Sequence, residues 1–162
     1  MTASLISQAF KKCKKEGRPA LLTYTVAGDP TKKISLEILK SISKNIDIIE
    51  SGMAFSTPIA DGGDIQTSAH RAIKAGINLN ETFKIVKKFK KIEYSKIKKL
   101  NNSKNVVIGF GITEKTIKSL KKADGLVVGS AICKEITNSL KKRQNTVTNV
   151  TNVVRRLKNK IK

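Results

Sequence analysis

The strongest constraint on the fold is a repeated order of strand, loop and helix. Four short apolar segments typical of strands lie at residues 20–26, 46–50, 106–108 and 126–128, and each is followed by a glycine-containing loop and then a helix-like stretch. No hairpin signal joins any two of them. The pattern therefore predicts a single α/β domain whose strands pair in parallel through right-handed crossovers.

The helices between these strands carry recognisable end signals. Gly17 and Gly76 follow helical periodicity and can close the helices before them, and Thr31 and Thr113 can cap the helices after them. The predicted helices cover residues 5–15, 31–44, 65–75, 80–92, a weaker 93–100, 114–122, a segment beginning at 130 and a tail at 137–162, with a turn at 101–104.

The charge of the chain permits an anionic partner but does not specify one. The net charge is +21, and residues 82–162 contribute 22 Lys+Arg against 4 Asp+Glu. Of the 33 cations 28 are Lys, whereas Arg is favoured for phosphate and base recognition. Lys, Ile and Asn have AT-rich codons, so composition drift also explains the charge. The seven aromatic residues are not interleaved with the basic runs, and this argues against nucleic-acid binding.

Several protein classes are excluded by residue usage. Two distant cysteines and one histidine give neither a disulfide framework nor a zinc-ligand spacing, so no metal site is predicted. No run of 18 apolar residues predicts a membrane span, and the basic residues at 11–15 follow the first apolar segment, which is the reverse of a secretory signal. We expect a cytoplasmic protein with reduced thiols.

Two carboxylates occupy positions suited to catalysis. Glu50 is the last residue of the second predicted strand, and Asp61 follows in a loop rich in glycine and proline. Ligands of parallel α/β folds meet the loops after the carboxyl ends of the strands, where a rigidly held carboxylate can act as general acid or base. The pattern alone is more often that of solvated acids at a strand end.

Glycines at two later strand-to-helix junctions predict a phosphate site. Gly109-Phe110-Gly111 and Gly129-Ser130 each place backbone N–H groups beside the start of a predicted helix. Glycine is also the ordinary turn residue, so this prediction depends on the two junctions converging. His70 falls within a predicted helix, far from any cysteine, and is interpreted as a structural histidine.

Five sequence blocks resemble one family. They are YTVAGDP at 24–30, ESGMAFSTPIADGGD at 50–64, Ile65-Gln66, GFGI at 109–112 and GSAI at 129–132, in the order found in the tryptophan synthase alpha subunit. The resemblance runs from about residue 5 to residue 160. It implies a (β/α)8 barrel, of which this chain retains about four parallel strands with flanking helices.

The resemblance also implies that the middle of the barrel is missing. Such barrels take roughly 250 residues, so the chain is about 90 short. We expect residues 1–92 to hold the first two β/α units, 93–104 a junction, and 105–162 the last two, within one truncated domain. Barrel strands 7, 8, 1 and 2 would then form a contiguous sheet in that order. An internal deletion and an incomplete gene sequence both account for the gap.

The family's activity assigns roles to the candidate residues. The alpha subunit cleaves indole-3-glycerol phosphate to indole and glyceraldehyde 3-phosphate by a retro-aldol reaction, as a lyase of tryptophan biosynthesis. It uses no metal or cofactor, because pyridoxal phosphate belongs to the beta subunit. By resemblance, Glu50 and Asp61 are catalytic. Tyr24 and Phe110 match substrate-binding positions, and the phosphate-binding positions are Gly111, Gly129 and Ser130.

Departures from the family pattern leave alternatives open. Thr57 replaces an acid in a loop that contacts the beta subunit, and Gly63 replaces a proline beside Asp61. The missing strands also remove the far wall of the pocket. The chain could therefore be a working lyase, or a catalytically impaired remnant that binds a phosphate or a partner. Open sheet edges further predict self-association.

Overall fold

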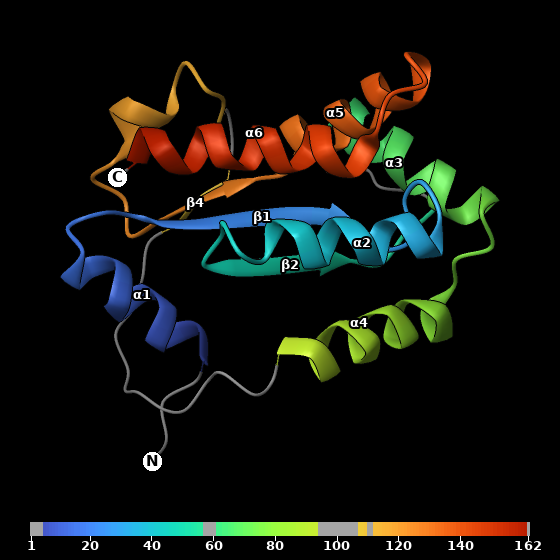
Figure 1. Cartoon of the computed structure of the whole chain (residues 1–162), viewed down its shortest axis with the longest axis horizontal. Helices are drawn as coiled ribbons and strands as arrows, with labels where there is room; N and C mark the ends of the chain where they lie inside the picture. Colours follow the sequence, from blue (N-terminus) through green and yellow to red (C-terminus); the bar gives the residue numbers. More distant parts are fainter. Residues whose placement is uncertain (1–4, 57–60, 94–106, 110–111, 162) are drawn as a thin grey trace.

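The structure is a computed structural model that describes residues 5–56, 61–93, 107–109 and 112–161. It contains one four-stranded parallel sheet in the order β2-β1-β4-β3 (Figure 1). The strands are β1 (Ala20–Val26), β2 (Ile48–Gly52), β3 (Val107–Ile108) and β4 (Gly125–Val128). This arrangement confirms the predicted α/β class and the predicted neighbours, with β3 and β4 in the places of barrel strands 7 and 8.

One face of the sheet carries the main core. Leu21, Leu126 and Val128 alternate along β1 and β4 and point to this face, where α2 (Lys32–Ile42), α5 (Ser130–Lys141) and α6 (Thr146–Ile161) pack. The helix residues buried against them are Ile38, Ile42, Ile132, Ile136, Val150, Val153, Val154, Leu157 and Ile161. Because side chains alternate between the two faces of a strand, Tyr24 and Glu50 lie on the opposite face of the sheet.

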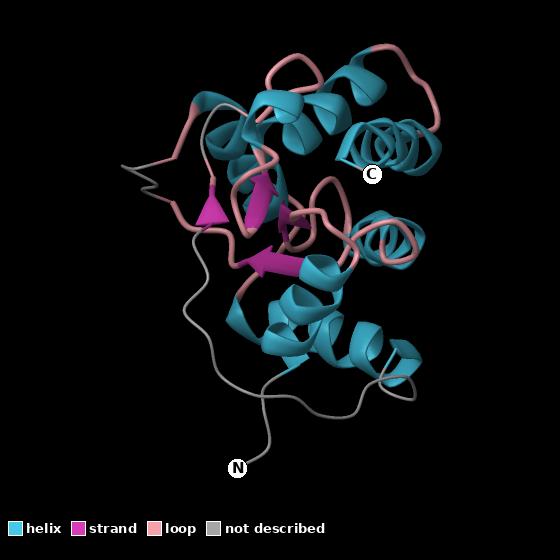
Figure 2. Cartoon of the chain, turned by 90° about the vertical axis from the view of Figure 1, so that its left-hand side faces the viewer, coloured by secondary structure: helices cyan, strands magenta, loops and turns pink. Residues whose placement is uncertain are grey.

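The opposite face is covered at the amino ends of its strands by α1 (Leu5–Lys15). Phe10 and Cys13 of α1 pack against Ala20 and Leu22 of β1. Gly125 allows this contact, since a Cβ there would lie 2.8 Å from the ring of Phe10. Figure 2 shows the strands between an upper group of helices, which includes the C-terminal helix, and a lower group.

The remaining helices follow β2. They are α3 (Gly63–Lys74) and α4 (Leu79–Glu93). α3 packs against α5, and α4 packs against α2. Among the described residues, no helix is long and apolar enough to cross a membrane.

The position of β2 corrects one prediction. The strand begins at Ile48 and ends at Gly52, so Glu50 is its third residue and not its last. The reason is Asp47, whose carboxylate accepts a hydrogen bond from the backbone N–H of Leu21 at 2.8 Å. The carbonyl of Leu21 in turn accepts a bond from the N–H of Asp47 at 3.0 Å. Asp47 is thereby held just before the strand.

Two predicted helices are also wrong in extent. The predicted helix 114–122 is a turn followed by a short 3₁₀ helix, η2 (Ile117–Leu120), because the hydroxyls of Thr113 and Thr116 bond to nearby backbone N–H groups. The predicted tail helix is divided between α5 and α6. Asn145 caps α6 by accepting a bond from Thr148 N–H at 2.9 Å, and Arg143 between the helices has φ +53°. The predicted turn at 101–104 and most of the predicted helix 93–100 lie outside the described residues.

Candidate active site

Strand pairing places two of the predicted site residues together. Tyr24 of β1 lies directly opposite Glu50 of β2 in the parallel register. Both therefore point to the face that α1 covers at its other end. Gly52, two residues after Glu50, leaves room for the Tyr24 ring, because a Cβ at this position would overlap the tyrosine hydroxyl. Glu50 itself is exposed, whereas Tyr24 is half-buried.

The electrostatics of Tyr24 connect it to both predicted carboxylates. Burial raises the pKa of the Tyr24 hydroxyl, and the negative charge of Asp61 raises it further, as do those of Cys133 and Glu50. Burial and the acidic groups both favour the protonated, neutral form of the Tyr24 phenol.

Asp61 is held by the first turn of α3. The side-chain amide of Gln66 donates a hydrogen bond to the Asp61 carbonyl at 2.8 Å. The N–H groups of Ile65 and Gln66 close the turn by bonding to the carbonyl of Gly62 at 2.9 and 3.0 Å. Because these bonds belong to the helix start, the position of Asp61 depends on where α3 begins.

The predicted phosphate residues Gly129 and Ser130 lie at the start of α5 and beside the start of α3. A Cβ added to Gly129 would lie 3.4 Å from Tyr24 Cβ and 3.5 Å from Ile65 Cδ1. A Cβ added to Gly62 would lie 3.8 Å from Ser130 Oγ. The first N–H groups of a helix have no partner within the helix and favour an anion. Two helix starts therefore converge beside Tyr24.

Part of the predicted site cannot be placed. Phe110 and Gly111 lie outside the described residues, as does Thr57. Their neighbour Gly109 is exposed at the end of β3. The structure therefore brings together Tyr24, Glu50, Asp61, Gly129 and Ser130, while the roles of all seven predicted residues remain predictions.

A buried cluster next to this site was missed by the sequence reasoning. Asp29, in the loop after β1, has a fully buried side chain that forms an ion pair with Arg71 of α3 at 2.7 Å. Ser68 of α3 donates a hydrogen bond to the same carboxylate. Cys133 of α5 is also buried, and burial raises the pKa of its thiol to about 11. The sequence signal that could have found this cluster is the position of Asp29 between Gly28 and Pro30, in a loop at the end of a strand.

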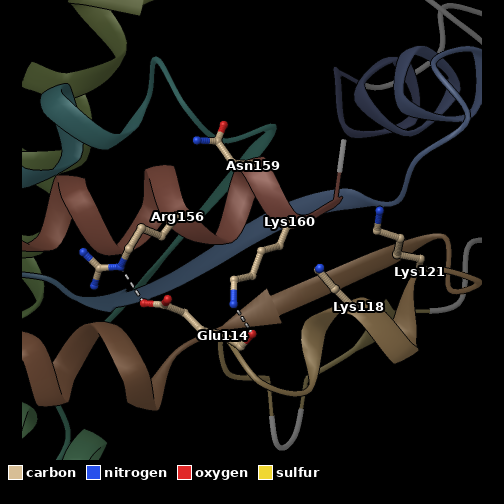
Figure 3. Close-up of a pocket in the computed structure, with 6 residues that line it drawn as sticks. All are labelled: Glu114, Lys118, Lys121, Arg156, Asn159 and Lys160. Atoms are coloured by element: carbon tan, nitrogen blue, oxygen red, sulfur yellow. Dashed lines mark hydrogen bonds and ion pairs between the residues drawn. The ribbon is translucent and has the colours of Figure 1, made fainter.

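A hollow of about 460 Å³ lies elsewhere, between η2 and α6. Figure 3 shows its lining, in which Arg156 pairs with the Glu114 carboxylate at 2.7 Å and Lys160 donates to the Glu114 carbonyl at 2.7 Å. The lining residues are Glu114, Lys118, Lys121, Arg156, Asn159 and Lys160. None of the predicted site residues is among them, and the largely charged lining does not suit an indole ring.

Metal chemistry finds no support in the described part of the chain. Within residues 5–56, 61–93, 107–109 and 112–161, no group of three or more His, Cys, Asp or Glu side chains is arranged to hold a metal ion. Cys13 and Cys133 are both free and buried.

Comparison with known proteins identifies the family of the chain. The family model for "Tryptophan synthase alpha chain" matches in two segments, residues 10–96 and 91–162. The tryptophan synthase alpha chain of Pelagibacter ubique is 43% identical over 263 alignment positions, covering 98% of this chain and 99% of that protein. Since this chain has 162 residues, roughly 100 of those positions have no counterpart here.

Solved structures show the same fold. Tryptophan synthase subunit alpha from Legionella pneumophila aligns with a TM-score of 0.86 and 17% identity, covering 99% of this chain and 98% of that one. A chain of the tryptophan synthase α2β2 complex from Pyrococcus furiosus aligns with a TM-score of 0.71 and 22% identity, covering 85% and 97%. These relatives are (β/α)8 barrels. The chain belongs to the tryptophan synthase alpha chain family, whose function is to cleave indole-3-glycerol phosphate.

Proposed function

We propose that this chain is itself a lyase of tryptophan biosynthesis, which cleaves indole-3-glycerol phosphate into indole and glyceraldehyde 3-phosphate. The observation that carries the proposal is the pairing of Tyr24 with Glu50, beside the starts of the two helices that follow Asp61 and Gly129. An aromatic side chain beside a carboxylate suits an indole substrate that has to gain and lose protons.

In the proposed mechanism, Glu50 is the general acid and base. A proton is added to the indole ring carbon that carries the side chain, and a proton leaves the adjacent side-chain hydroxyl. The carbon–carbon bond between them then breaks, which releases indole and the aldehyde without gain or loss of atoms. Asp61 stabilises the positive charge that develops on the indole nitrogen. An exposed Glu50 can exchange its proton with solvent between turnovers.

The remaining predicted residues bind the substrate. Tyr24 and Phe110 contact the indole ring. The backbone N–H groups at Gly111, Gly129 and Ser130 hold the phosphate, helped by the positive end of α5. No cofactor takes part. The buried free cysteines are consistent with a reducing compartment, and we place the protein in the cytoplasm.

We further propose that the missing barrel units lie between α4 and β3. The two segments of the family match meet near residues 91–96, which supports residues 1–92 and 105–162 as the two retained parts and 93–104 as their junction. The beta subunit is the proposed protein partner, since related alpha chains occur in tryptophan synthase complexes. Thr57 leaves this contact without the family's acid.

One observation favours a second function. Glu50 is exposed, so nothing among the described residues shields it from water. Electrostatic stabilisation and positioning weaken when water enters a site. A chain that lacks one wall of the pocket could retain the phosphate site at α5 and act as a binding module without turnover.

Indole release from indole-3-glycerol phosphate distinguishes these two functions. The purified chain, with its fold verified by circular dichroism, is assayed with and without a beta subunit. We expect release by the wild type and its loss in Glu50→Gln and Asp61→Asn. Glu37→Gln is the matched control, because it removes an equal charge from an exposed position on α2 and should retain activity.

The contrary result is equally informative. A folded wild-type chain that releases no indole under either condition refutes the lyase. Titration of that chain with inorganic phosphate then tests the binding module, for which saturable binding lost in Gly129→Val is expected. Release that persists in Glu50→Gln would refute the assignment of Glu50.

A further inference from the structure

The buried cluster behind the candidate site ties three segments of the chain together. Arg71 of α3 donates from Nε to Asp29 Oδ1 at 2.7 Å and from Nη2 to Asp29 Oδ2 at 2.8 Å. Its third nitrogen, Nη1, donates to Thr137 Oγ1 of α5 at 2.8 Å. One guanidinium therefore links the loop after β1 to two helices.

Arg71 and Thr137 lie at similar depths on their helices. Arg71 is eight residues after Gly63, the first residue of α3, and Thr137 is seven residues after Ser130, the first residue of α5. Seven residues are about two helical turns. The bond between them therefore sets how far α3 is shifted along α5, and with it the position of Asp61 relative to Gly129 and Ser130.

The burial of the cluster makes this link rigid. The Asp29 side chain is fully buried and that of Arg71 is 22% exposed. The carboxylate also accepts a bond from the buried hydroxyl of Ser68. A buried, hydrogen-bonded network of this kind has few alternative arrangements.

We propose that Arg71 is a positioning residue of the lyase, which fixes the distance between the Asp61 carboxylate and the phosphate site at the start of α5. The inference rests on the proposed function. It goes beyond it by assigning a role to a side chain that touches neither substrate nor reacting atoms. Arginine is required because its planar fork reaches Asp29 and Thr137 together, and lysine has no such geometry.

Two conservative variants separate positioning from simple charge balance. Arg71→Lys keeps a cation beside buried Asp29 but loses the bond to Thr137. Thr137→Val keeps the ion pair and removes the link to α5, together with the bond that the Thr137 hydroxyl donates to the Cys133 carbonyl within α5 at 3.0 Å. Arg156→Lys is the control, because it alters an arginine whose ion pair with Glu114 is exposed and distant from the site.

The first measurement is the kinetics of indole release. We expect kcat of Arg71→Lys and Thr137→Val to fall roughly 10- to 100-fold, as misplacement by about an ångström does, while KM changes less than about twofold. Arg156→Lys should match the wild type. Wild-type kcat in Arg71→Lys would show that Arg71 only balances the charge of Asp29, and would overturn the proposal.

The second measurement does not depend on activity. Amide hydrogen exchange is followed at the N–H groups that close the first turns of α3 and α5, with the N–H of Ala20, bonded to Asp124 at 2.9 Å, as the internal reference. The reporting amides are those of Ile65, Gln66, Ile132 and Cys133. Both variants should speed exchange there by about tenfold and leave Ala20 unchanged.

This second measurement keeps the two proposals distinguishable. If the wild type has no lyase activity, local exchange at the two helix starts still supports the link through Arg71, while the proposed function fails. If exchange is unchanged, or rises equally at Ala20, Arg71 has no positioning role and the inference is refuted.

Discussion

Replacing Asp47 by alanine should cost this protein much of its stability. Asp47 lies before β2, and its side chain, 10% exposed, accepts bonds from three other residues: Arg18 in the loop before β1, Leu21 of β1 and Lys158 of α6. Arg18 donates at 2.8 and 3.0 Å, Lys158 of α6 at 2.6 Å, and the backbone N–H of Leu21 at 2.8 Å. Asp47→Ala leaves two nearly buried cations and one N–H without this acceptor.

The contacts that survive the substitution set the size of the effect. Breaking a buried ion pair from one side costs about 3–5 kcal/mol. Arg18 keeps its bonds to Glu16 at 2.7 Å and to the Pro19 carbonyl at 3.1 Å, which favours the lower end of that range. We expect a loss of about 3 kcal/mol in the free energy of unfolding, or a fall in Tm of roughly 6–12 °C for a domain of this size.

The effect should also depend on pH in a defined direction. Burial alone would raise the pKa of the Asp47 carboxyl, but hydrogen bonds from Arg18, Lys158 and the Leu21 N–H outweigh burial and hold it well below its usual range. A carboxyl whose pKa is lower in the folded state stabilises that state fully above its unfolded pKa of about 3.9. The stability difference between wild type and Asp47→Ala should therefore be constant above about pH 5 and shrink at lower pH.

Urea unfolding followed by circular dichroism between pH 3 and pH 8 measures this difference. Glu16→Gln is the matched control, since it changes the net charge by the same amount and removes a contact to Arg18 from an exposed position. The control should lose less than about 1 kcal/mol. A similar loss in both variants, or a difference that does not narrow below pH 4, would refute the reasoning.

Three further expectations follow from other parts of the molecule. Gly63→Pro should raise the free energy of unfolding by about 0.4–1 kcal/mol in the same assay. Gly63 is the first residue of α3, a Cβ added to it would have no neighbour within 4 Å, and Gly62 before it is extended. A destabilised variant would contradict this expectation. Burial raises the pKa of the Cys13 and Cys133 thiols to about 11. A disulfide reagent at pH 8 should therefore react slowly with the native protein and rapidly with both thiols in denaturant. Fast reaction with the native protein would be the contrary result. The outer edges of β2 and β3 have no strand partner among the described residues, so sedimentation should detect self-association of the chain. The association should increase with salt, because salt screens the repulsion between chains of net charge +21. A monomer at every salt concentration would argue against this expectation.

Local sequence signals predicted the central strand of the sheet well and the boundaries of other elements less well. The β1 prediction, residues 20–26, is confirmed residue for residue, because an apolar run between Pro19 and the Ala27–Gly28 turn has one interpretation. β2 was misplaced by two residues, since its start depends on Asp47 bonding to Leu21, a contact across 26 positions. The break between α5 and α6 was hidden because apolar periodicity continues across Asn145.

The candidate site shows the same division. The resemblance assigned Tyr24 and Glu50 to one substrate site, and the parallel register sets them directly opposite each other on neighbouring strands. The Asp29–Arg71 pair was not predictable, because it joins residues 42 positions apart and its geometry exists only once α3 is packed. Contacts made by side chains between elements are the part that sequence patterns leave open.

The central position of β1 and β4 has a consequence for the synthesis of this protein. The register pairs Ala20 with Gly125 and Thr23 with Val128, so the innermost seam of the sheet joins segments more than a hundred residues apart. Folding slows when native contacts are this distant along the chain. The N-terminal half must therefore leave the ribosome and wait, with the apolar surface of β1 uncovered, until β4 has been translated. We expect the exposed apolar surface of such a nascent chain to attract chaperones until β4 has been made.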